Sequence, residues 1–106
     1  MDRTAYDAWR ALPFPSGSSV DEVDEAHADL AYWDAMTAET VVPMVERASA
    51  YDPGVLDFPS GLAALRDRLL VLREAVSDSE ADVLGGYVEY VDALVAVNRW
   101  AADESR

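Results

Sequence analysis

Apolar residues recur every three or four positions along residues 20–42, which is the spacing of an amphipathic α-helix with one buried stripe. Ser19 and Glu22 have the spacing of a capping box that would open this helix. Pro43 lacks an amide hydrogen, so the pattern predicts a bend there and a continuation to about Ala50. The stripe consists of Val23, Ala26, Leu30, Trp33, Thr37 and Val41.

Apolar residues recur at the same spacing of three or four positions in the segments before and after this helix. Residues 4–12 predict a short helix with Thr4 as its N-cap and aromatic side chains that can dock on the rest of the chain. After a predicted loop at 51–59, Ser60 is expected to cap a third helix with a leucine-rich seam. This seam contains Leu62, Leu65, Leu69, Leu72 and Val76.

A fourth helix is predicted from Ser77 or Ser79 to about Ala102, and its apolar face is unusually wide. The face contains Val83, Leu84, Tyr87, Val88, Tyr90, Val91, Leu94, Val95 and Val97. One neighbour cannot cover so wide a face, so this helix is either central in a bundle or part of a homodimer interface. Asn98 lies within it and is expected to be a buried polar group that sets helix register.

These patterns predict an all-α fold, an antiparallel bundle of about four helices whose long second helix is kinked near Pro43. The chain of 106 residues has the length of one domain, 1–106. Cysteine is absent, which excludes disulfides and thiolate chemistry. We find neither a signal-peptide pattern nor an apolar run of transmembrane length, and we therefore expect a soluble cytoplasmic protein without membrane contact.

The net charge of −13 is concentrated in the second predicted helix, and no Arg or Lys lies between Arg10 and Arg47. Such a charge repels phosphate backbones and argues against direct nucleic-acid binding, whereas it attracts basic proteins. Lysine is absent, so all eight cations are arginines. A GC-rich genome or adaptation to a salty cytoplasm also explains this composition.

We therefore expect an acidic face on the second helix that binds a basic protein partner. Its residues are Asp21, Glu22, Asp24, Glu25, Asp29 and Glu39, with Tyr32 and Met36 adding apolar contact. The expected function is that of a small non-catalytic interaction module, such as an inhibitor, an immunity or antitoxin-like protein, or a regulatory adaptor, without metal or cofactor. One alternative is a structural subunit that forms a homodimer through the wide face of the last helix.

A second alternative comes from Glu22-x-x-Glu25 and Glu89-x-x-Asp92. This pair of motifs resembles the magnesium-binding signature of all-helical nucleotide pyrophosphohydrolases, although in that family the two halves lie much closer along the chain. The resemblance implies a metal-dependent hydrolase in which the four carboxylates converge on Mg²⁺.

Two polar residues of the second helix stand out. Asp34 falls inside the apolar stripe, where a carboxylate has to be paired, protonated or set at an opening in the core, and Arg66 or Arg73 of the third helix could be its partner. His27 is the only histidine, and its spacing of three from Asp24 favours a pair on the helix surface.

Overall fold

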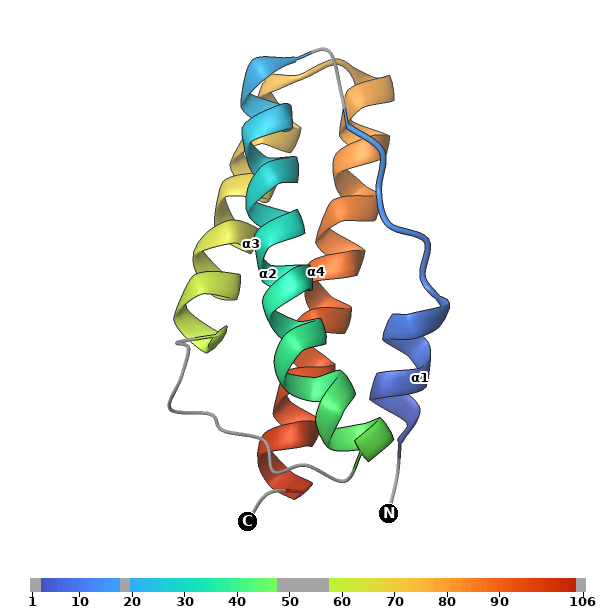
Figure 1. Ribbon diagram of the computed structural model, residues 1–106. Coiled ribbons are helices and arrows are strands. Elements are labelled where there is room, and N and C mark those ends of the chain that lie inside the picture. The colour runs from blue at the N-terminus through green and yellow to red at the C-terminus, as the bar shows by residue number, and fades with distance from the viewer. Residues whose placement is uncertain (1–2, 18–19, 48–57, 105–106) are drawn as a thin grey trace.

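The computed structural model describes residues 3–17, 20–47 and 58–104, and these residues form four α-helices and no β-strand. The helices are α1 (Thr4–Ala11), α2 (Asp21–Arg47), α3 (Phe58–Ala75) and α4 (Asp78–Glu104). Figure 1 shows α2, α3 and α4 side by side, with α3 running against the direction of the other two and α1 beside α4. The all-α bundle predicted from the sequence is confirmed.

Helix starts agree only in part with the expected caps. Arg3 rather than Thr4 is the N-cap of α1. Helix α3 begins before Ser60, so this serine lies in the first turn and is not the cap. At α4 the Ser77 hydroxyl accepts a hydrogen bond from the Glu80 amide at 3.4 Å, as a capping box requires. The expected cap of α2, Ser19, lies outside the described residues.

Helix α2 continues through Pro43 as far as Arg47. A proline within a helix removes one backbone hydrogen bond and crowds the preceding turn, which is why we predicted a bend. The helix does not end there, and the bend itself stays a prediction. Residues 48–50, which we expected to be helical, lie outside the described part of the chain.

Helix α4 is the centre of the bundle, since it packs against α1, α2 and α3. Most of its wide apolar face is buried in this way, but Val83 remains 40% exposed. The chain itself therefore covers the face that also suggested a dimer interface. The buried residues of α4 are Leu84, Tyr87, Val88, Tyr90, Val91, Leu94, Val97, Asn98 and Ala101.

Asn98 is a buried polar residue of this core, as expected. Its side-chain amide donates to the Thr37 hydroxyl of α2 at 3.1 Å and to the Leu94 carbonyl at 2.8 Å. Because an unpaired amide in the core would be costly, this contact favours one alignment of α2 against α4.

The short helix α1 docks through two aromatic residues, Tyr6 and Trp9, which are both buried. The ring of Trp100 lies 6.4 Å from that of Tyr6, so the end of α4 packs against α1.

Among the residues that the structure describes, none of the helices combines the length and the apolar character that a bilayer crossing requires.

Helices α2 and α3 approach each other closely at Gly61. A β-carbon built on Gly61 would overlap the indole ring of Trp33, because the ring lies directly over the glycine. The absence of a side chain at this position is therefore a packing requirement.

We predict that Gly61→Ala destabilises the protein by about 1–3 kcal/mol, since a rigid indole has to move or the helices have to separate. Gly86→Ala is the control, because a β-carbon there meets nothing within 4 Å. Alanine should stabilise the helix at that position by up to about 1 kcal/mol. Urea unfolding of both variants measures the difference, and equal effects would contradict this account of the α2–α3 contact.

Candidate functional site

The acidic face predicted from the sequence lies on one continuous helix, α2, on the side that faces away from the buried stripe. The buried residues of this helix are Val23, Ala26, Leu30, Thr37 and Val41. All six carboxylate residues of the face are exposed; Tyr32 is 51% exposed and Met36 is half-buried. We use the name acidic face for Asp21, Glu22, Asp24, Glu25, Asp29, Tyr32, Met36 and Glu39.

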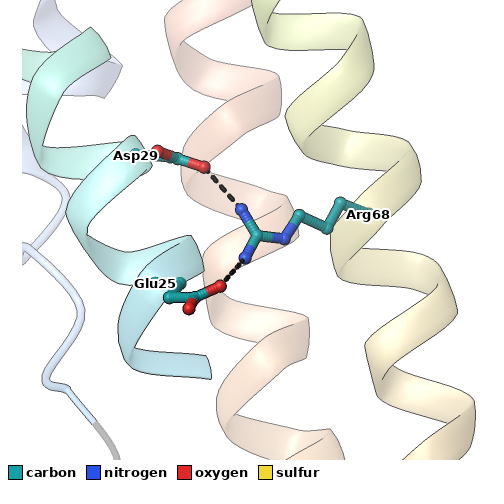
Figure 2. Close-up of polar contacts among 3 residues, drawn as sticks. All are labelled: Glu25, Asp29 and Arg68. Atoms are coloured by element: carbon teal, nitrogen blue, oxygen red, sulfur yellow. Dashed lines mark hydrogen bonds and ion pairs between the residues drawn. The ribbon is translucent and has the colours of Figure 1, made fainter. Parts of the chain in front are cut away.

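The middle of the acidic face contacts an arginine of α3. Figure 2 shows the guanidinium of Arg68 between two carboxylates, with Nη1 2.6 Å from Asp29 and Nη2 2.8 Å from Glu25. These groups are largely accessible to solvent, so the pairs contribute only about 0–1 kcal/mol each to folding. Their effect on the surface is larger, because one positive charge lies between two of the negative ones.

The remainder of the face keeps its charge. Among the described residues, Asp21, Glu22 and Glu39 form no ion pair. Asp24 lies at the edge of the face beside the segment 12–17, where its carboxylate would be 3.3 Å from a β-carbon at Gly17. The face therefore has uncompensated carboxylates on both sides of the Arg68 bridge.

Within the part of the chain that the structure describes, Asp34 does not pair with an arginine, and the expectation of a partner at Arg66 or Arg73 was wrong. Its carboxylate accepts hydrogen bonds from the Tyr90 hydroxyl at 2.5 Å and from the Trp9 indole nitrogen at 3.2 Å. Arg66 instead pairs with Asp92 of α4 at 2.9 Å. Neutral donors thus satisfy this carboxylate, and the contact joins α1, α2 and α4.

The environment of Tyr90 raises its pKa well above the usual value of 10.0. Burial is the main cause, because it disfavours the phenolate, and the hydrogen bond and negative charge of Asp34 act in the same direction. Tyr90 is therefore a protonated hydrogen-bond donor over the physiological pH range.

His27 also has a different role from the one expected, because it contacts the segment before α2 rather than pairing with Asp24. Its Nε2 lies 2.9 Å from the Pro15 carbonyl, and its ring packs edge-to-face against Phe14 at 5.1 Å. The Tyr87 hydroxyl donates to the Ser16 carbonyl of the same segment. These contacts hold residues 14–16 against α2 and α4.

The four carboxylates of the hydrolase alternative are not gathered around one centre. Glu25 is held by Arg68, whereas Asp92 is held by Arg66, and these are two separate contacts of α3. Within the described ranges, no group of three or more Asp, Glu or His side chains is arranged to hold a metal ion. The geometry therefore offers no support for a Mg²⁺ site formed by Glu22, Glu25, Glu89 and Asp92.

Sequence reasoning missed Arg68 as a neighbour of the acidic face and Trp9 and Tyr90 as partners of Asp34. The helical period places Arg68 at the edge of the leucine seam, where a long side chain can reach a neighbouring helix. Tyr90 and Trp9 carry polar groups at the ends of buried rings, and such groups need a partner. Both signals are present in the sequence, but they do not name the partner.

No protein family, curated protein or solved structure matches this chain.

The raised pKa of Tyr90 gives a prediction for alkaline pH. The folded protein binds the phenolic proton more tightly than the unfolded chain does, so the stabilising contribution is present below about pH 10 and is lost as the pH rises through the folded pKa. We expect Tyr90→Phe to lose about 1–3 kcal/mol near neutral pH, because the hydrogen bond to Asp34 is gone. Its free energy of unfolding should then fall less steeply above pH 10 than that of the unmodified protein.

Urea unfolding near neutral pH and at two alkaline values measures both effects. Tyr32→Phe is the control, because this phenol is 51% exposed and lies on the outer side of α2. Parallel alkaline profiles for Tyr90→Phe and the unmodified protein would show that the contact with Asp34 does not hold the proton.

Proposed function

We propose that this protein is a small non-catalytic interaction module that binds a basic protein surface through the acidic face of α2. Binding covers the cationic site of the partner, as an inhibitor, an immunity or antitoxin-like protein, or a regulatory adaptor would do. The observation that supports this proposal most strongly is a set of exposed carboxylates on one helix, Asp21, Glu22 and Glu39, that have no ion-pair partner among the described residues.

The electrostatics favour a protein partner over a catalytic role for these carboxylates. A net charge of −13 attracts a basic partner over roughly 8–10 Å at physiological salt and accelerates the encounter. Tyr32 adds an exposed aromatic ring between the acids, and aromatic residues are frequent anchors in protein interfaces. The combination provides steering by charge and a local apolar contact.

Part of the acidity also has a structural explanation. Asp21, Glu22 and Asp24 lie in the first turn of α2, where negative charge interacts favourably with the helix dipole. This effect contributes about 0.3–1 kcal/mol per residue, so a binding test has to leave most of the first turn intact. Glu39 has no such role, because it lies far from the helix start.

The absence of lysine allows a direct test of which carboxylates touch the partner. A zero-length carbodiimide joins carboxylates to amines, and this chain carries no side-chain amine of its own. With a co-purified basic partner, we expect cross-links from partner lysines to Asp21, Glu22 and Glu39, read by mass spectrometry. Asp67 and Glu74 of α3, which are also exposed, should remain unlinked. Links spread evenly over both sets would contradict a defined binding face.

Charge reversal gives the corresponding energetic test. Glu22→Arg with Glu39→Arg should weaken binding of the cross-linked partner at least about tenfold at low salt, mainly through slower association. Asp67→Arg with Glu74→Arg changes the net charge equally on another helix and should have a much smaller effect. Surface plasmon resonance at low and high salt measures both variants. Equal losses would indicate a response to net charge alone.

Arg68 offers a test in the opposite direction. Arg68→Gln removes the cation between Glu25 and Asp29 and should increase affinity for the same partner about two- to tenfold. The two freed carboxylates then repel each other, with a cost of only about 0.2–0.5 kcal/mol. Unfolding and binding are measured on the same sample, and unchanged affinity would place Glu25 and Asp29 outside the interface.

A further inference from the structure

A second surface lies where residues 12–16, which follow α1, run along α4 (Figure 1). Residues 12–16 and the first half of α4 enclose a groove of about 470 Å³. That volume falls within the range of about 300–1,000 Å³ typical of sites for small ligands or a few side chains. None of the residues of the acidic face lines it.

The walls of this groove are apolar, exposed and held in place. Phe14 and Val83 are each 40% exposed, and they are two of the four large hydrophobic residues exposed in the described part of the chain. The Phe14 ring packs edge-to-face against Tyr90 at 5.4 Å and against His27 at 5.1 Å. Because those contacts fix the ring, the groove exists before any partner binds, which lowers the entropic cost of binding.

The groove also has an open position on α4. Gly86 lines it, and a β-carbon built there meets no atom within 4 Å. A glycine in the middle of a helix costs about 1 kcal/mol relative to alanine, and packing within this chain does not require it. The missing side chain leaves space beside Phe14 and Val83 for a side chain of another molecule.

The rim of the groove is negative. Asp82 and Glu89 line it and are exposed, no arginine lines it, and neither carboxylate forms an ion pair within the described residues. The two residues are seven positions apart along α4, so their α-carbons lie about 10 Å from each other. In an extended peptide, side chains two and four residues apart face the same way and lie about 7 and 13 Å from each other, because a strand rises about 3.3 Å per residue. Two cations four residues apart therefore bracket the two carboxylates, and their flexible side chains take up the difference of about 3 Å.

We propose that this groove binds an extended basic segment of a partner protein, with an apolar side chain over Gly86 midway between two cations four residues apart, all three on one face of the segment. The cations pair with Asp82 and Glu89, and the apolar side chain fills the space between Phe14 and Val83. A second copy of this chain fits poorly, because its own charge of −13 opposes association. The site is independent of the acidic face and does not depend on the function proposed for it.

The test uses a fluorescein-labelled peptide with the core Arg-Thr-Leu-Thr-Arg, followed by fluorescence anisotropy and by amide NMR of the isotope-labelled protein. We expect saturable binding with shifts at Phe14, Val83 and Gly86. Gly86→Leu should weaken binding about tenfold or more, because the added side chain occupies the open position, where a β-carbon meets no atom within 4 Å. Asp82→Asn with Glu89→Gln should weaken it in a salt-dependent manner.

Gly85→Leu is the matched control. It makes the same substitution one residue earlier, where the nearest atoms belong to the flexible Arg73 side chain at 3.9 Å, and it should bind the peptide as the unmodified protein does. A peptide with the core Arg-Thr-Ser-Thr-Arg keeps the charge and should bind at least about tenfold more weakly.

The proposal is overturned if Gly86→Leu and Gly85→Leu bind the peptide equally, or if the serine peptide binds as tightly as the original. Either result would mean that the basic peptide is attracted to the acidic protein by net charge alone and does not bind in the groove. Shifts confined to α2 would likewise reject the groove and point to the acidic face. Self-association of the protein at high concentration that the peptide reverses would identify a second copy as the occupant.

Discussion

The apolar face of α4 is too wide for a single neighbouring helix, and its burial determines how the rest of the chain is arranged. Helices α1, α2 and α3 all pack on it. Because exposed apolar area costs roughly 25 cal/mol per Å², an arrangement that leaves half of this face in water would be much less stable. The short helix α1 takes part in this burial, since Tyr6 and Trp9 are buried and α1 packs on α4.

The same constraint orients α2. Its buried stripe faces the core, so the carboxylates of the acidic face are exposed to solvent, whereas Asp34 lies within the stripe. Concentrating so many like charges on one helix is unfavourable, and two features of the fold offset part of this repulsion. The first-turn acids interact with the helix dipole, and Arg68 bridges Glu25 and Asp29. Neither reaches Glu39, so part of the face stays open to a partner.

Polar contacts between helices add specificity to this apolar packing. Asp34 receives hydrogen bonds from Tyr90 and Trp9, and Asn98 donates to Thr37. A shift of α2 along α4 would break these contacts and leave buried polar groups without partners, which costs about 1–3 kcal/mol for each group. His27 and Tyr87 hold residues 14–16 in place through contacts with the Pro15 and Ser16 carbonyls. These residues form one wall of the groove at Gly86.

The sequence by itself determined the fold class, the four helices and the outward orientation of the acids, because each follows from a local period of three to four residues. Helix starts were less well determined: Ser77 caps α4, but Thr4 and Ser60 do not cap their helices, since several residues near a helix start can serve as caps. Only the tertiary structure decided that Asp34 meets Tyr90, that Arg68 lies between Glu25 and Asp29, and that Phe14 and Gly86 line one groove. These pairs are distant in sequence, and their contacts depend on how the helices rotate and align when the face of α4 is buried.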